Sequence, residues 1–516
     1  MNSPDRPSRR RTGSRRIAIT LATALTVAAC GGGGGAPSDT LSIGYSFATE
    51  TFDPVYAIAG AQGSAHIDAL YGSLLERGED QELAPGMAES WEWTDPTTLV
   101  LQLRDGITFT DGEAFDAEAV KTYFEYFRDA PDAPYGRLDA VEEVVVEDPT
   151  TVRLDLSAPD PTLLHSLVGH AGSVPSPRAI EAGDLGINPV GAGPYVLDEG
   201  RTTLDSVYTY TRNPDYWNAE AFEFETLELR IYTDANAMYN ALVSGQADVG
   251  YGDASNVAAA EGTDLGIHSQ PHNANGIQLF DLAGEEFPPL ADVRVRQAMQ
   301  MAVDRQAIID TTFQGRGLPS VLTATPGSGP GYDESLLDFW PYDPDRARSL
   351  LAEAGQADGF SFQAVTLAKD QPMAEAVSGY LAQVGITMDL VVRPPGETAN
   401  TDIGAYAAAA AARGLSDGYA TPELLYLGPV KASNQRGYEV PEIRDLYEAM
   451  LVAQGDEQDQ LMRDISRISV EGAYSIQVGY VDSLTYYDTE VVEGVHVLPG
   501  HGGPYILDGL RRTDVT

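Results

Sequence analysis

Residues 188–195 read Asn188-Pro189-Val190-Gly191-Ala192-Gly193-Pro194-Tyr195. Gly191 and Gly193 predict a tight turn that leads into a strand, because glycine adopts backbone conformations that other residues avoid. A phosphate-binding loop is excluded, since Val196 stands where such a loop needs a third glycine and a strand is expected to follow in place of a helix. The stretch is therefore expected to build the fold and not to carry chemistry.

Short strands and helices alternate on both sides of this turn. Strands are predicted over 41–47, 99–103 and 386–391 from their apolar patterning. Helices are predicted after aspartate or proline, because both suit the first turn of a helix. These helices are 116–128, 234–245, 292–309, 343–355 and 372–385, with two more that begin at Glu442 and Asp456. The pattern indicates a mixed α/β protein whose lobes are joined by crossing strands, since no low-complexity linker follows Thr40.

The chain of 516 residues has a formal net charge of −45 at pH 7. Without residues 1–29, which hold six arginines and Asp5, it keeps 26 basic and 76 acidic residues and a net charge of −50. Such a body repels nucleic acid and anionic lipid, so nucleic acid is not an expected partner. The length exceeds what a single hydrophobic core supports, so two or three lobes are expected.

Cys30 is the only cysteine of the chain. It follows an arginine-rich start and the apolar run Ile17–Ala29, a combination typical of an export signal. The run is too short to span a bilayer, which takes roughly 20 apolar residues. The string that ends in Ala28-Ala29-Cys30 resembles the lipobox of bacterial lipoproteins. That resemblance implies a signal peptide over 1–29, diacylation of Cys30, and a flexible tether over 30–40 that holds the protein at the outer face of the cell membrane. A buried free thiol in a signal peptide that is cleaved elsewhere is the alternative, and Sec and twin-arginine export both stay open.

Six collinear segments resemble the extracellular solute-binding proteins of family 5, which are the peptide, opine and nickel receptors of ABC importers. The segments are 71–77 (YGSLLER), 85–92 (PGMAESWE), 103–112 (LRDGITFTDG), 188–195 (NPVGAGPY), 212–217 (RNPDYW) and 288–305 (PPLADVRVRQAMQMAVDR). Thr110 stands where the family has a histidine. Trp91, Trp93 and Trp217 are expected to fill cores, and Asp292 is expected to cap a helix and not to act as a catalytic acid.

The resemblance implies an α/β fold of the type II periplasmic-binding-protein kind, with two ligand-clasping lobes, an extra domain and a discontinuous first lobe. The expected parts are lobe I over 41–70, 172–265 and 488–516, the extra domain over 71–171, and lobe II over 266–487. Strands near 265–270 and 485–490 would form the hinge, and the lobes would close over a ligand by bending there.

The same resemblance carries over two groups of ligand contacts. The candidate ligand-binding residues are Tyr45, Phe47, Tyr406, Arg413, Asp417 and Tyr419. The first two belong to the loop after the first strand, which continues over 57–62. The other four lie before a proline-containing turn of the second lobe, where the tyrosines would stack on or border the ligand.

Asp417 corresponds to an aspartate that pairs with the α-ammonium group of the ligand in peptide-binding members. A buried carboxylate that faces an ammonium group makes a strong charge-assisted contact, and Arg413 could keep the carboxylate ionised between ligands. The chain departs from the family pattern in two ways, since Gly414 replaces a common tryptophan and the spacing to Pro422 is one residue longer. A solvated turn aspartate beside Gly418 is the alternative interpretation.

The function implied is capture of a small solute, foremost a di- or oligopeptide, and its delivery to the permease and ATPase subunits of an ABC importer. No cofactor is expected, and the protein is expected to be a monomer. A receptor for a metal chelate of the nickel type, or for another non-peptide solute, is the alternative. A dedicated metal site is not expected, because the histidine pairs His165/His170 and His268/His272 lack further ligands and a convincing helix.

A serine hydrolase is the remote alternative. Residues 414–418 fit G-x-S-x-G with Ser416 as nucleophile. The later residues Asp445 or Asp464 and His496 or His501 follow in the required order. The motif needs a buried strand before it and a helix directly after it, whereas six alanines precede it and residues 418–422 interrupt any helix. The chain is therefore not expected to be an enzyme.

Overall fold

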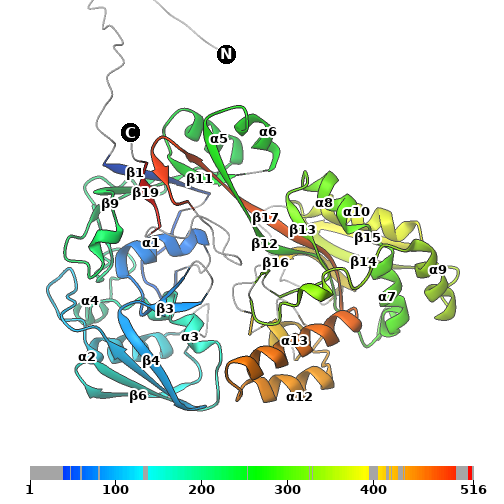
Figure 1. Cartoon of the computed structure of the whole chain (residues 1–516), viewed down its shortest axis with the longest axis horizontal. Coiled ribbons are helices and arrows are strands. Elements are labelled where there is room, and N and C mark those ends of the chain that lie inside the picture. The colour runs from blue at the N-terminus through cyan, green and yellow to red at the C-terminus, as the bar shows by residue number, and fades with distance from the viewer. Residues whose placement is uncertain are drawn as a thin grey trace, which may run out of the picture. The chain divides into compact units, whose positions relative to one another are not determined.

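Two long antiparallel strands, β12 (Leu265–Leu279) and β17 (Ser475–Asp488), lie side by side in the middle of an 11-stranded sheet. The computed structural model describes residues 39–46, 48–57, 61–78, 82–131, 138–252, 254–324, 326–327, 329–393, 405–413, 418–419, 421–427, 434, 436–495 and 509–513. Figure 1 shows the two strands running between the strands near β1 and those near β14.

The large sheet has the strand order β15-β14-β16-β12-β17-β11-β1-β10-β9-β8, and β13 pairs with β17 beside this path. Its other strands are β1 (Thr40–Tyr45), β8 (Tyr195–Leu197), β9 (Val207–Arg212), β10 (Thr226–Ile231), β11 (Val249–Gly252), β13 (Gly317–Pro319), β14 (Phe360–Leu367), β15 (Ile386–Arg393) and β16 (Ala408–Arg413). β1 is parallel to β10 and β11, and β14 is parallel to β15 and β16. The pair β12–β17 is antiparallel and links these two parallel groups.

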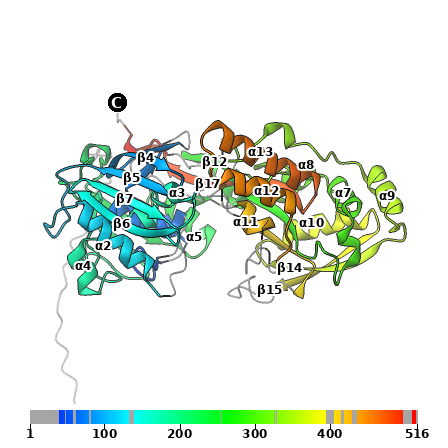
Figure 2. The same ribbon diagram turned by 90° about the horizontal axis from the view of Figure 1, so that it is seen from below.

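A second, four-stranded antiparallel sheet has the order β4-β5-β7-β6. Its strands are β4 (Ala88–Asp95), β5 (Thr98–Leu103), β6 (Val141–Asp148) and β7 (Thr151–Leu156). Helix α2 (Ala117–Arg128) packs on this sheet, as Figure 2 shows. Two small pairs are β2 (Leu75–Arg77) with β3 (Leu83–Pro85) and β18 (Val492–Glu493) with β19 (Arg511–Arg512).

The other helices flank these sheets. They are α1 (Ala61–Tyr71), α3 (Leu163–Ser166), α4 (Pro177–Ala182), α5 (Ala235–Val243), α6 (Val257–Ala260), α7 (Val293–Met301), α8 (Arg305–Thr312), α9 (Pro344–Glu353), α10 (Gln371–Ala382), α11 (Thr421–Tyr426), α12 (Pro441–Met450) and α13 (Asp456–Glu471). Short 3-10 turns are η1 (His170–Gly172), η2 (Ala219–Ala221), η3 (Ala254–Asn256), η4 (Pro288–Ala291) and η5 (Glu334–Leu336). Within the described ranges, no helix is long and apolar enough to cross a membrane.

Separate hydrophobic cores lie against the two sheets. One core gathers β1, α1 and β8–β10, a second lies between α2 and the four-stranded sheet, and a third gathers β14–β16 and α7–α13. Along β17, Ile476 and Val478 belong to the third core, whereas Leu484 and Tyr486 belong to a small core around α5. The strand pair thus passes from one core to another, as predicted for crossing strands. The domain boundaries derived from the family resemblance stay predictions.

Aspartate caps account for most of the predicted helices. Asp116 accepts hydrogen bonds from the backbone N–H groups of Glu118 and Ala119, and α2 ends at Arg128 as predicted. Asp234 and Asp343 cap α5 and α9 in the same way. These local signals are confirmed because a cap needs only the residues of its own first turn.

The single helix predicted over 292–309 is wrong. Asp292 caps α7 as expected, but α7 ends at Met301 and a second helix, α8, begins at Arg305. The second helix has its own cap, since the carboxylate of Asp304 accepts a hydrogen bond from Ala307 N at 3.0 Å. An aspartate inside a helical pattern competes for backbone N–H groups, and here it restarts the helix.

The turn predicted at Gly191 and Gly193 leads into β8, but the reason for the glycines is different. Neither residue has a positive φ angle. A Cβ atom on Gly191 would lie 2.3 Å from the carbonyl oxygen of Leu70, and one on Gly193 would lie 2.4 Å from the carbonyl carbon of Leu70. The glycines therefore permit close approach to the end of α1. Asn213 of the RNPDYW segment stabilises the same turn, because its side-chain amide donates a hydrogen bond to Gly193 O at 2.9 Å.

The tryptophans predicted to fill cores lie at the edges of cores instead. Trp91, Trp93 and Trp217 are half-buried and pack against the core of the four-stranded sheet. Trp217 also stacks under the guanidinium group of Arg104, whose central carbon lies 4.2 Å from the ring centroid.

The alanine run forms a strand, contrary to the expectation from its composition. Ala408–Arg413 is β16, which pairs with β12 on one side and with β14 on the other. Ala408 and Ala410 are almost fully buried in the third core. The small side chains suit a strand that is enclosed in the sheet and covered by helices, where packing outweighs the low strand preference of alanine.

Candidate functional site

Tyr45 ends β1 and is fully buried in the core beside α1. Its ring lies 6.0 Å from the ring of Tyr251 on β11 and 6.5 Å from that of His66 on α1. Phe47, predicted to act with Tyr45, lies outside the described residues, as do residues 58–60 of the same loop. The ligand-binding role of Tyr45 and Phe47 stays a prediction.

His66 is a buried polar residue that sequence reasoning missed. Its Nδ1 atom lies 2.5 Å from the hydroxyl of Tyr210, and the rings of Phe52 and Tyr208 pack around it. Burial lowers the pKa of His66 to about 3, so the imidazole is neutral at physiological pH. A lone histidine in a helix gives no signal of such an environment before the strands that enclose it are placed.

Tyr406 precedes β16 and packs against Phe280 and Val365. The guanidinium carbon of Arg393 lies 5.8 Å from its ring centroid, and Arg393 Nη2 lies 3.4 Å from its hydroxyl. The backbone of Arg413 pairs with Ala274 of β12 at the end of β16. Asp417 lies outside the described residues, so its pairing with a ligand ammonium group stays a prediction.

Tyr419 is placed between two parts of the chain that are far apart in sequence. Its hydroxyl donates a hydrogen bond to Asp459 Oδ1 of α13 at 3.3 Å. Its ring centroid lies 5.6 Å from that of His165 on α3, with an interplanar angle of 37°. His165 in turn accepts a hydrogen bond at Nδ1 from Arg77 Nη2 of β2 at 3.1 Å. Burial, together with the positive charge of Arg77, lowers the pKa of His165 to about 4.

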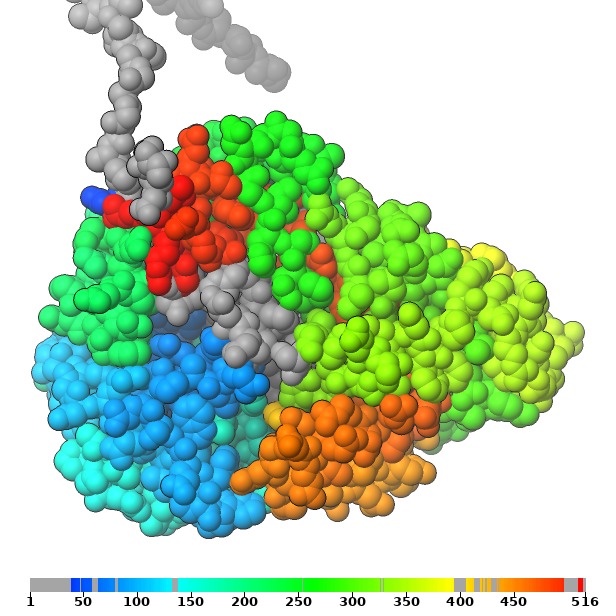
Figure 3. Space-filling model, viewed as in Figure 1, coloured from blue at the N-terminus to red at the C-terminus, as the bar shows by residue number. Residues whose placement is uncertain are grey.

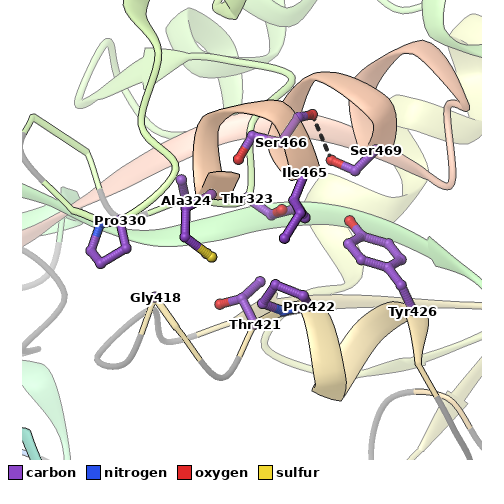
Figure 4. Close-up of a pocket in the computed structure, with 11 residues that line it drawn as sticks. Thr323, Ala324, Pro330, Gly418, Thr421, Pro422, Tyr426, Ile465, Ser466 and Ser469 are labelled. Atoms are coloured by element: carbon purple, nitrogen blue, oxygen red, sulfur yellow. Dashed lines mark hydrogen bonds between the residues drawn. The ribbon is translucent and has the colours of Figure 1, made fainter. Parts of the chain in front are cut away.

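A small pocket lies beside this segment, and Figure 4 shows it between the turn at Gly418 below and the helix that carries Ile465, Ser466 and Ser469 above. Its volume is about 10 Å³, which is room for one water molecule. The described lining residues are small, apolar or hydroxyl-bearing and come from three segments. They are Thr323, Ala324, Pro330, Gly418, Thr421, Pro422, Tyr426, Met462, Ile465, Ser466 and Ser469.

The histidine pairs do not meet at a shared site in the described part of the chain. His268 and His272 both lie on β12, where His272 occupies a bulge in the pairing with β17, and burial lowers its pKa to about 4. His165 contacts Arg77, whereas His170 Nε2 lies 3.4 Å from the hydroxyl of Ser64. Among the described residues, no three histidine, cysteine, aspartate or glutamate side chains gather closely enough to hold a metal ion.

The residues proposed for a hydrolase are only partly described. Asp445 lies exposed on α12, and Asp464 on α13 accepts a hydrogen bond from Gln460. Ser416, His496 and His501 lie outside the described residues. The strand β16 does precede the G-x-S-x-G segment, but α11 begins only at Thr421, five residues after Ser416.

One sheet that passes between separate cores through a pair of long strands, with an additional four-stranded domain, is the architecture of a type II periplasmic binding protein. The chain belongs to the bacterial extracellular solute-binding proteins of family 5, because the profile of the middle region of that family matches residues 82–434. The family and fold class predicted from the six segments are confirmed. Relatives of the chain include a glutathione-binding protein, and its structural neighbours include an ABC transporter-associated periplasmic binding protein.

Curated relatives and solved structures extend this likeness. The glutathione-binding protein GsiB of Salmonella paratyphi A is 29% identical over 371 residues, which cover 70% of each chain. The binding protein AgaA in complex with agropinic acid, from A.tumefacien R10, is 25% identical, with a TM-score of 0.75 over 92% of this chain and 98% of that chain. DppA from Helicobacter pylori in complex with the peptide STSA is 19% identical, with a TM-score of 0.74 over 93% of this chain and 99% of that chain, and shows the fold alone.

Proposed function

We propose that this protein captures a di- or oligopeptide between two lobes and delivers it to the permease and ATPase subunits of an ABC importer. The observation that carries the proposal is the passage of β12 and β17 between separate cores, because two strands are a connection that can bend while each core stays intact. The bulge at His272 interrupts the pairing within this connection. The likeness to the glutathione-binding protein supports a peptide, since glutathione is itself a small peptide.

The lobes of the proposed receptor are 41–70 with 172–265 and 488–516 for the first, and 266–487 for the second, with 71–171 as the extra domain. The third core, which runs from Ile277 to Val478, and the core of the four-stranded sheet support this division. Tyr45 and Phe47 of the first lobe, with Tyr406, Arg413, Asp417 and Tyr419 of the second, are the proposed ligand contacts.

A non-peptide solute is the second candidate. The likeness to AgaA, which was solved with the opine agropinic acid, favours a small anionic ligand that Arg413 would meet as a carboxylate partner. The two candidates differ in what Asp417 does, because an opine without a free α-ammonium group gives this aspartate no charged partner.

The ligand can be identified directly by denaturing the purified protein and measuring what it releases by mass spectrometry. We expect peptides, and a single non-peptide molecule would contradict the proposal. In a thermal-shift series with glutathione, dipeptides, tetrapeptides and agropinic acid, a true ligand at 100 times its Kd should stabilise the fold by about 2.7 kcal/mol.

Asp417→Asn should weaken binding of a peptide on the order of 10- to 100-fold, and should not change binding of its N-acetylated form.

The anchor is tested separately. We propose that Cys30 is diacylated and holds the receptor at the membrane, as its lipobox-like context predicts. In cells that express the full chain, Cys30→Ser should move the protein from the membrane fraction to the soluble fraction without changing ligand affinity, because a lost acyl anchor removes the membrane attachment alone. Equal membrane retention of the variant and the natural chain would show that Cys30 is not the anchor.

A further inference from the structure

The contact between His165 and Tyr419 joins two separate hydrophobic cores. His165 lies on α3 between Leu163 and Leu167, which belong to the core of the four-stranded sheet. Tyr419 packs against the core of β14–β16 and α7–α13. The two rings are 254 positions apart in the chain and lie 5.6 Å apart between centroids. Figure 3 shows the helices α12 and α13, in orange, on the side of their core that faces the blue and cyan residues.

Each ring is held by a charged residue of its own core. Arg77 of β2 donates a hydrogen bond to His165 Nδ1 at 3.1 Å, and Asp459 of α13 accepts one from the Tyr419 hydroxyl at 3.3 Å. The order Arg77, His165, Tyr419, Asp459 therefore places two neutral rings between a cation and an anion. Because Arg77 uses the Nδ1 lone pair, His165 must be unprotonated at that atom for the contact to form.

We propose that His165 is a positioning residue for ligand binding, because its stacking on Tyr419 holds the two cores together in the ligand-binding conformation. Protonation of His165 breaks this contact, so ligand binding weakens at acid pH. The inference rests on the proposed function, because it assumes that two lobes close around a solute.

The direction of the pH effect follows from the groups around His165. In this conformation burial and Arg77 disfavour the imidazolium form, and the pKa is lowered to about 4. The charged and titratable groups against this contact include Arg77 on β2, Tyr419 itself and Asp459 on α13. When the lobes separate, water reaches the ring and its pKa moves toward the ordinary value of about 6.5. Acid therefore favours separation, and the ligand loses affinity as the pH falls from about 6.5 toward 4.

The test compares variants in binding assays between pH 7.5 and 5. His165→Ala should weaken binding roughly three- to tenfold at pH 7.5, the range expected for one aromatic pair. His165→Phe keeps a ring but cannot titrate, so it should bind within about threefold of the natural chain at pH 7.5 and lose less affinity at pH 5. Tyr342→Ala is the matched control, because the exposed Tyr342 forms an aromatic pair at 5.7 Å with Tyr380, which packs against a single core, and its loss should leave affinity unchanged.

Small-angle scattering of the unliganded protein provides a readout that does not need a ligand. The natural chain should expand between pH 7.5 and 5, and His165→Phe should expand less. If both chains keep the same radius and the same pH profile of binding, His165 has no positioning role. If no solute binds any variant but the scattering differs as expected, the contact stands and the proposed function fails. A melting temperature for each variant identifies any that do not fold.

Discussion

Gly193→Ala is expected to destabilise the fold by about 3–5 kcal/mol, the upper range for single substitutions. The added Cβ atom would lie 2.4 Å from the carbonyl carbon of Leu70 and 2.6 Å from Tyr71 N. Both are backbone atoms at the end of α1, so no side-chain rotation relieves the clash. The hydrogen bond from Gly193 N to Leu70 O, 3.0 Å long, would be strained at the same time. Urea unfolding followed by circular dichroism measures the loss.

Gly379→Ala is the matched control. Gly379 is exposed on α10, and nothing lies within 4 Å of the position that its Cβ atom would take. Alanine is the better helix former, so this substitution should leave stability unchanged or raise it by up to about 1 kcal/mol. Equal stability of the two variants would mean that the backbone near Leu70 can move aside, and that the close packing of these segments is not obligatory.

Arg305→Met is expected to have the second largest effect, a loss of about 3–5 kcal/mol, because each unsatisfied buried acceptor costs about 1–3 kcal/mol. The buried guanidinium group donates from Nε to Gln477 O at 2.9 Å and from Nη1 to Trp340 O at 3.0 Å. It also donates to the side-chain oxygen of Gln300. Burial lowers the pKa of Arg305 to about 10, so the guanidinium group stays charged at neutral pH and its buried N–H groups need hydrogen-bond acceptors.

The comparison for this prediction is Arg346→Met. Arg346 is half-exposed on α9 and pairs with Glu353 at 2.7 Å, a surface contact of the kind that contributes at most about 1 kcal/mol. Urea midpoints of the two variants should therefore differ clearly, with similar m-values. A loss below about 1 kcal/mol for Arg305→Met would show that water replaces the guanidinium group at its acceptors.

The segment 288–305 contributes several polar side chains that bind backbone carbonyls near the start of β17. Arg296 donates to Gly472 O at 3.0 Å, and Gln300 donates to Ser475 O. With the bond from Arg305 to Gln477 O, three polar side chains from α7 and α8 hold the start of β17. The motif thus fixes the strand that connects the cores, which is a structural task.

Sequence signals that involve only a few adjacent residues predict the structure correctly. Features that depend on contacts with distant segments are not predicted. The caps at Asp116, Asp234 and Asp343 were predicted correctly, because capping involves only the next three residues. The break at Asp304 was missed because the periodicity of 292–309 continues through it. The glycines at 191 and 193 were located correctly but explained wrongly, since the residue they approach, Leu70, lies more than 100 positions earlier.

The candidate site shows the same difference between local signals, which the sequence displays, and contacts between distant residues, which it does not. Tyr419 was named from the resemblance of its segment to the family, but its partners His165 and Asp459 carry no pattern that links them to it. In the sequence His165 is recognisable only as one of a histidine pair, because spacing along the chain is the only relation that the sequence displays. The buried place of His66 beside Tyr210 was likewise invisible, since it depends on β9 packing against α1.

The amino-acid sequence alone was sufficient for the family, the α/β class, the helix starts and the context of Cys30, because each rests on a contiguous string or a local hydrogen bond. The tertiary structure was needed to place β16 inside the sheet, to set Gly193 against α1 and to bring His165 onto Tyr419. These features depend on the approach of segments that are distant in the chain, and packing between such segments outweighs the local preferences that a sequence displays.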